Sequence, residues 1–140
     1  MMHIRTAALT VSSALALSGL LAAPAHADRS VGQDRVASFF SQYRDAFLGQ
    51  GGETPRQVED EFLTPDLISE LDSWAKTHNA DPVFRSKVAP SNWSVKYNGS
   101  GAGHTGVILT ETFSSGTSQD VWYELELVRY MIDDLMDAPA

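Results

Sequence analysis

The sequence predicts an α+β fold in which N-terminal helices pack on a curved, cone-like antiparallel sheet. Two observations lead to this class. Apolar residues over 36–75 recur at steps of three and four, the period of a helix that buries one face. Over 93–127 the period changes to two, the period of a strand with one buried face. Because the helices come first and the strands afterwards, the order is that of an α+β domain.

The first 27 residues are predicted to be a secretory signal peptide. A short basic start containing Arg5 precedes an apolar run over 6–23, and residues 25–27 read Ala-His-Ala, a cleavage signal. Cleavage after Ala27 would leave one small domain, residues 28–140. We therefore expect a secreted, extracellular bacterial protein with no membrane span after cleavage.

Three helices are predicted in the first half of this domain. The inner face of the first carries Val36, Phe39, Phe40, Tyr43 and Phe47, and the glycine-rich residues 49–52 end it. Thr54 and Gln57 form a capping box that starts a second, short helix. Thr64, followed by proline, starts the third helix, which Asn79 is predicted to end. Residues 28–32 and 137–140 are expected to fray.

Alternating segments predict the sheet in the second half. Residues 93–97 lead into an Asn98-Gly99 turn, residues 107–113 follow, and a second turn over 114–118 precedes residues 121–127. In the last of these segments, Glu124 and Glu126 alternate with apolar residues, which indicates that one sheet face is solvated. Residues 128–135 fit either a bent strand or a last short helix.

Composition excludes several functions. The chain has 18 acidic and 10 basic residues and a formal net charge of −8, which argues against a nucleic-acid partner. It has no cysteine, so disulfides, thiol catalysis and thiolate metal sites are excluded. Residues 101–106 match G-x-G-x-x-G but precede a predicted strand, whereas a dinucleotide site needs a helix there. The sequence predicts no cofactor and no metal.

Two sets of residues are candidates for a site. The rings of Tyr43, Trp74, Trp93 and Trp122 would line a pocket for an apolar or sugar ligand, with ordinary core packing as the alternative. A general-base role for His104 requires a nearby carboxylate and a pocket. The acidic end that contains Asp133 lacks a calcium-loop pattern and is interpreted as solvated.

Three stretches resemble the nuclear transport factor 2-like (cystatin-like) superfamily. Residues 36–47 resemble its long first helix, residues 62–67 resemble a second-helix start of exported bacterial members, and residues 121–135 resemble its closing strand. The resemblance implies a conical fold with an internal pocket, in which the enzymes of the superfamily place an aspartate. Asp133 lies in the matching closing strand, with Tyr43 or His104 as its helper. The superfamily includes isomerases, hydrolases and non-enzymatic binding domains.

These observations leave three functions open. The first is a secreted, non-catalytic binding or accessory domain for a small apolar ligand, a cell-wall component or a protein. The second is a small isomerase or hydrolase, which requires a buried Asp133 with a raised pKa beside a cavity. The third is an immunity- or inhibitor-type protein, which predicts a flat contact surface without a cavity. A homodimer is compatible with all three.

Overall fold

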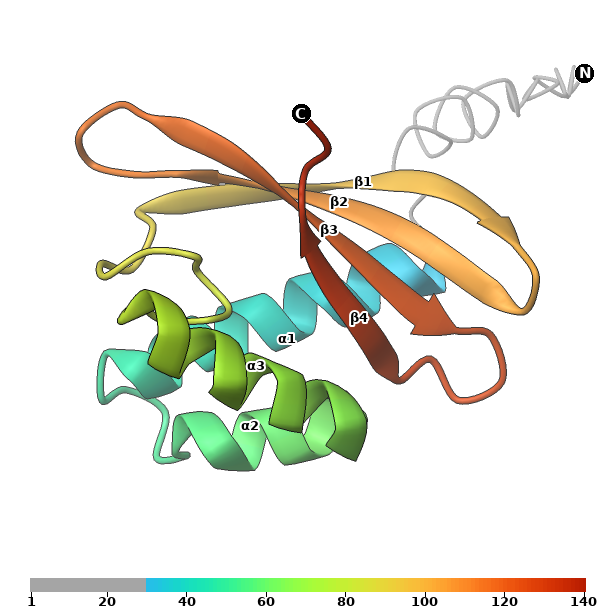
Figure 1. Ribbon diagram of the computed structural model, residues 1–140, viewed down its shortest axis with the longest axis horizontal. Helices are drawn as coiled ribbons and strands as arrows, with labels where there is room; N and C mark the ends of the chain where they lie inside the picture. Colours follow the sequence, from blue (N-terminus) through green and yellow to red (C-terminus); the bar gives the residue numbers. More distant parts are fainter. Residues whose placement is uncertain (1–29) are drawn as a thin grey trace, which may run out of the picture.

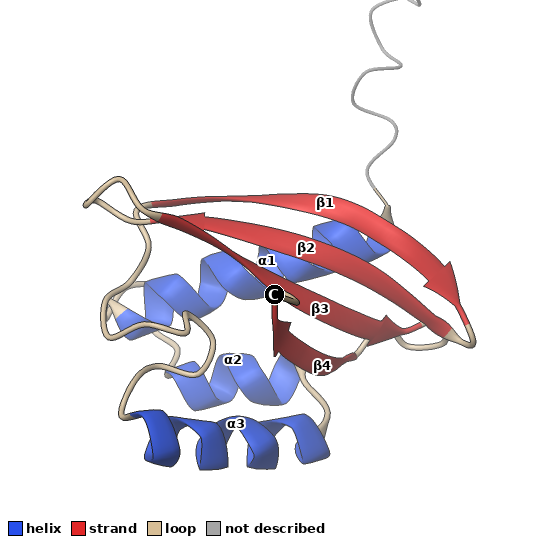
Figure 2. Ribbon diagram, turned by 45° about the horizontal axis from the view of Figure 1, so that its top comes forward, coloured by secondary structure: helices blue, strands red, loops and turns tan. Residues whose placement is uncertain are grey.

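Three helices cover one face of a four-stranded antiparallel sheet in the computed structural model, which describes residues 30–140 (Figure 1). The helices are α1 (Val31–Phe47), α2 (Pro55–Phe62) and α3 (Pro65–His78), and the strands are β1 (Asn92–Gly101), β2 (His104–Thr112), β3 (Ser118–Glu126) and β4 (Ile132–Asp137). The two-layer arrangement confirms the predicted α+β class (Figure 2). The predicted signal peptide lies outside the described residues.

The helices begin and end at local signals. Thr54 accepts a hydrogen bond from the Gln57 backbone in a capping box, as predicted, and Asn79 ends α3 in the left-handed conformation. Residues 28–32 were predicted to fray, and this prediction was wrong for residues 31 and 32, which are helical. Ser30 forms a second capping box with Gln33, so α1 starts at Val31. Within the described residues, no helix combines the length and apolarity that crossing a bilayer requires.

The sheet is a simple meander in the order β1-β2-β3-β4. The predicted Asn98-Gly99 turn was wrong, because β1 continues to Gly101 and the chain reverses at Ala102 and Gly103, both of which have positive φ. Gly99 also has a positive φ of 86°, but it lies where the β1–β2 register shifts, between Tyr97 and Ser100. The glycine therefore serves a β-bulge instead of the hairpin turn.

Residues 128–135, which fit either a bent strand or a short helix in the sequence, form a turn followed by most of β4. Tyr130 adopts a positive φ of 55°, and its N–H donates to the Glu126 carbonyl at 2.9 Å. A second register shift lies in β4, where Leu125 pairs with Ile132 while Glu124 pairs with Asp134. Asp133 is the extra residue of this bulge, and its side chain is thereby aimed differently from those of a regular strand.

An aromatic core lies between the two layers. Phe39 of α1 packs on Tyr43, Phe62 and Tyr123, with ring centroids 5.7, 5.7 and 6.3 Å apart. The ring of Phe40 lies 5.3 Å from that of Trp93 on β1. α1 packs against β1 and β2, and α3 packs against β4 (Figure 2). Since no disulfide is available, this buried apolar area supplies the main stabilisation of the domain.

Candidate functional site

A groove of about 410 Å³ opens on the outer face of the sheet, the face that points away from the helices. Its lining includes Asn98, His104, Gly106, Trp122, Glu124 and Met136. On β2 and β3 these residues alternate with the buried Val107, Tyr123 and Leu125, which face the helices. All four strands therefore contribute to the groove.

Gly106 lies in the lining of the groove, next to the β1 backbone. It pairs with Glu124 across the strands, and Trp122 occupies the next outward-facing position on β3. A Cβ atom at position 106 would lie 3.0 Å from the Asn98 carbonyl oxygen. The close approach of the β1 backbone at Asn98 therefore requires glycine at position 106.

His104 and Asp133 meet beside this groove. The His104 Nε2 atom lies 2.6 Å from Asp133 Oδ2, and its Nδ1 atom lies 3.2 Å from the Ala102 carbonyl oxygen. Both partners are acceptors, so the ring satisfies both contacts only when both nitrogens carry protons. The hydrogen bond to Asp133 accordingly raises the pKa of His104 above its ordinary value. When both nitrogens carry protons, the ring has no lone pair left to act as a base.

The predicted acid–base set is only partly assembled. The Asp133 side chain is 26% exposed and lies on the outer side of the sheet with His104, whereas the catalytic hypothesis required it to be buried. Tyr43 lies on the inner side, where its hydroxyl donates to Asp81 Oδ2 at 2.7 Å. Burial and the Asp81 carboxylate raise the pKa of Tyr43, so its hydroxyl keeps its proton.

The four aromatic residues proposed to line one pocket lie in three places. Tyr43 and Trp93 belong to the packing between α1 and the sheet. The ring of Trp74 stacks on that of His78 at 4.0 Å and lies 4.4 Å from the guanidinium carbon of Arg85. Only Trp122 lines the groove, where it is half-buried.

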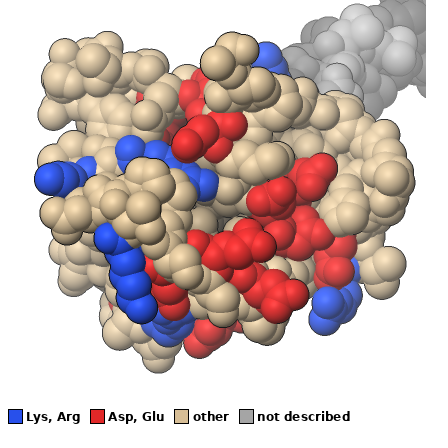
Figure 3. All heavy atoms as spheres, in the orientation of Figure 1, with Lys and Arg blue, Asp and Glu red and all other residues tan. Residues whose placement is uncertain are grey.

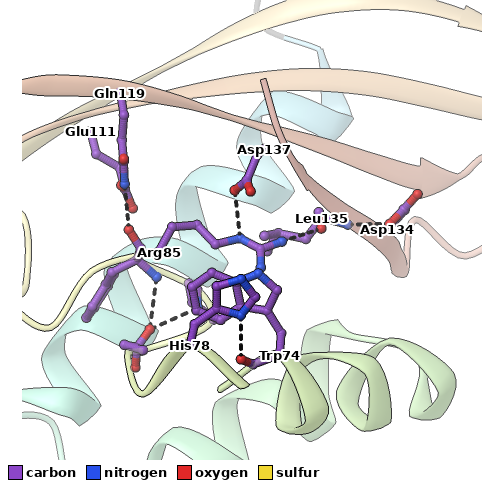
Figure 4. A network of polar contacts seen from close by, with 11 residues as sticks. Trp74, His78, Arg85, Glu111, Gln119, Asp134, Leu135 and Asp137 are labelled. Atoms are coloured by element: carbon purple, nitrogen blue, oxygen red, sulfur yellow. Dashed lines mark hydrogen bonds and ion pairs between the residues drawn. The ribbon is translucent and has the colours of Figure 1, made fainter. Parts of the chain in front are cut away.

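A buried polar network that the sequence did not reveal connects the 81–86 loop to the sheet (Figure 4). Gln119 Nε2 donates to Glu111 Oε2 at 2.8 Å and to the Phe84 carbonyl at 2.9 Å. Arg85 donates to the Leu135 carbonyl at 2.6 Å and pairs with Asp137. The one available signal was that Glu111 is in phase with the inward-facing Val107 and Leu109.

Burial determines the protonation of this network. Glu111 is completely buried, and desolvation raises its pKa to about 7. Its Oε1 atom, the Tyr123 hydroxyl and Arg85 Nη1 have no hydrogen-bond partner among the described residues. The network ties a loop to three strands, and we assign it a structural role.

Carboxylates dominate the surface around β4 (Figure 3). Two of them are neutralised locally, since Asp133 pairs with His104 and Glu126 with Arg129 at 2.8 Å. Glu124 and Asp134 are directly opposite each other on β3 and β4, and no basic side chain among the described residues forms an ion pair with either. Like charges in this position repel one another.

Comparison with known proteins supports the fold only. No family model and no curated protein matches the sequence. The chain is similar to a crystal structure of a protein of unknown function from Bacteroides thetaiotaomicron, with a TM-score of 0.57 and 22% sequence identity. The match covers 77% of this chain and 88% of that chain. At this level of identity the similarity shows a shared fold and carries no function.

Proposed function

We propose that the chain is a non-catalytic binding domain whose ligand occupies the groove on the outer face of the sheet. The groove itself is the observation that carries this proposal. It is a hollow of about 410 Å³, large enough for a small ligand or for side chains of a protein partner. Its lining combines an aromatic ring, Trp122, with polar groups such as Asn98 and Glu124 that can fix orientation.

The chemistry beside the groove favours binding over catalysis. A general base needs a free lone pair, and both nitrogens of His104 already contact oxygen acceptors. Tyr43, the other proposed helper, lies on the opposite side of the sheet. The hollow also favours a pocket-type ligand over the flat contact surface expected of an immunity-type protein.

We further infer that the domain works outside the cytoplasm as an exported member of the nuclear transport factor 2-like superfamily. The helices packed on a curved antiparallel sheet support this membership, and the apolar run before Ala27 supports export. Mass spectrometry of the protein secreted by a bacterial host tests the second point. We expect an N-terminus at Asp28; protein retained at full length inside the cell would contradict it.

The groove can be tested by nuclear magnetic resonance on residues 28–140. Mixtures of neutral apolar fragments, oligosaccharides and charged peptides are added, and backbone amide shifts are mapped. We expect shifts to concentrate at Gly106, Trp122 and His104. Trp122→Ala should abolish them, whereas Trp74→Ala, which removes the same ring outside the groove, should not. Shifts that concentrate elsewhere, or no shifts with any mixture, would refute the proposal.

A further inference from the structure

We propose that the groove receives the guanidinium group of an arginine side chain from a basic polypeptide partner. This inference rests on the proposed function and names the ligand class for the same site. It starts from two carboxylates, Glu124 and Asp134, that form no ion pair among the described residues.

One carboxylate in the groove and a second one beside it favour a cation. Glu124 lines the groove, and Asp134 lies directly opposite it on the adjacent strand. The Asp134 carboxylate points away from the Arg85 guanidinium, and its Oδ1 atom accepts only the Leu135 N–H, at 2.9 Å (Figure 4). Among the opposing cations, His104 is held by Asp133, and Lys96 lies two strands away from Trp122 in the same cross-strand row.

The shape of the pair favours a guanidinium group over an ammonium group. Side chains directly opposite each other on antiparallel strands have Cβ atoms about 5 Å apart. A planar guanidinium with five donors can bridge two carboxylates at this spacing, whereas an ammonium is a point charge. Trp122 stands one outward-facing position from Glu124, so its ring can contact the same cation.

Two other ligand classes fit the residues less well. No group of three or more potential metal-binding side chains occurs among residues 30–140, which disfavours a divalent cation. An anion would have to approach Glu124 and Asp134, which attract His104 and Arg85 from a distance but form no ion pair with either cation. A basic side chain instead relieves the repulsion between the two carboxylates.

Titrations with four capped tripeptides test the inference. Acetyl-Gly-Xaa-Gly-amide is used with arginine, lysine, citrulline or glutamate at Xaa, and the Gly106 amide and Trp122 indole resonances are followed at low salt. We expect the arginine peptide to bind most tightly and the citrulline peptide, which has the same shape without the charge, at least fivefold more weakly. Added salt should weaken the binding of the arginine peptide, because it screens the attraction between the guanidinium group and the carboxylates.

Variants of the two carboxylates test whether Glu124 and Asp134 bind the arginine peptide. Glu124→Gln and Asp134→Asn should each weaken binding of the arginine peptide about fivefold. Asp120→Asn is the control. Asp120 is an exposed carboxylate on β3, the strand of Glu124, and it accepts a hydrogen bond from the Thr110 hydroxyl, so its replacement should not alter binding. Both groove variants remove a repulsion, so both should fold, and either one suffices for the test.

The outcomes separate this inference from the proposed function. If the citrulline or glutamate peptide moves the groove resonances as strongly as arginine, the cationic ligand is refuted and the groove stands. If lysine equals arginine, the guanidinium preference is refuted. If Glu124→Gln and Asp134→Asn bind like wild type, the carboxylates are not the recognition element. If neither these peptides nor the ligand mixtures move the groove resonances, the proposed function fails together with the inference.

Discussion

Replacing Glu111 with glutamine should remove much of the loss of stability that this protein suffers as the pH rises. The Glu111 side chain is completely buried, and burial raises its pKa from 4.5 to about 7. Glu111→Gln keeps the size of the side chain and an acceptor oxygen for Gln119 Nε2. It replaces the ionisable carboxyl group by a carboxamide, which does not titrate.

Stability falls as the pH rises because the folded and the unfolded chain bind the Glu111 proton with different affinity. Below about pH 4.5, Glu111 is protonated in both the folded and the unfolded chain and costs nothing. Between pH 4.5 and 7 the unfolded chain loses this proton while the folded chain keeps it, so stability falls as the pH rises. Above about pH 7 the full cost applies. A difference between 4.5 and about 7 corresponds to roughly 3 kcal/mol, as an upper estimate.

Urea unfolding followed by tryptophan fluorescence at pH 4.5 and pH 8 measures this effect. We expect the free energy of unfolding of wild type to fall between the two pH values by up to roughly 3 kcal/mol more than that of Glu111→Gln. Glu59, whose pKa burial also raises to about 7, is present in both proteins and cancels in the comparison. Glu53→Gln, an exposed carboxylate in the loop after α1, should behave like wild type. Parallel pH profiles for wild type and Glu111→Gln would refute the reasoning.

Three further predictions concern the groove and the helices. Gly106→Ala should lower the free energy of unfolding by roughly 1–3 kcal/mol, because the added methyl group would lie 3.0 Å from the Asn98 carbonyl oxygen; a urea midpoint unchanged from wild type would contradict the close approach. Asp133→Asn should lower the pKa of His104, measured from its ring proton shifts, and an unchanged midpoint would show that the pair does not form in solution. Because the folded-state pKa is raised, the stability contributed by this pair is fully present below the unfolded value of 6.5 and is lost as the pH rises through the folded value. Thr54→Ala should cost about 1 kcal/mol by removing the cap of α2, whereas Thr54→Ser should retain most of it.

Local signals made the helices predictable. A helix start depends on hydrogen bonds between residues three apart, so Thr54 with Gln57, and Thr64 with Leu67, could be identified without knowledge of the rest of the chain. The helical period also identified the buried face of α1, since Phe39 and Phe40 are completely buried, but it was wrong for Phe47, which is 41% exposed at the end of the helix. The prediction of frayed ends failed for residues 31 and 32, because Ser30 and Gln33 form a capping box that starts α1 at Val31.

Strand ends and turns were less predictable than helix starts. Asn98-Gly99 has the composition of a tight turn, but cross-strand pairing made it a bulge. The turn before β4 uses Tyr130 at positive φ, which no preference of the isolated residue indicates. Both depend on pairing between distant segments, which a local pattern does not contain.

In the candidate site, too, local sequence patterns predicted some features and tertiary packing decided the others. Composition excluded thiol chemistry, and strand alternation correctly directed Glu124 and Glu126 to the outer face, because each depends only on residue type or on spacing within one segment. The meeting of His104 with Asp133, the hollow at Gly106 and the burial of Glu111 beside Gln119 depend on strand register, a bulge and a loop that folds back on the sheet. Contacts between side chains 8 to 29 positions apart arise only when the whole core packs, so tertiary structure alone decided them.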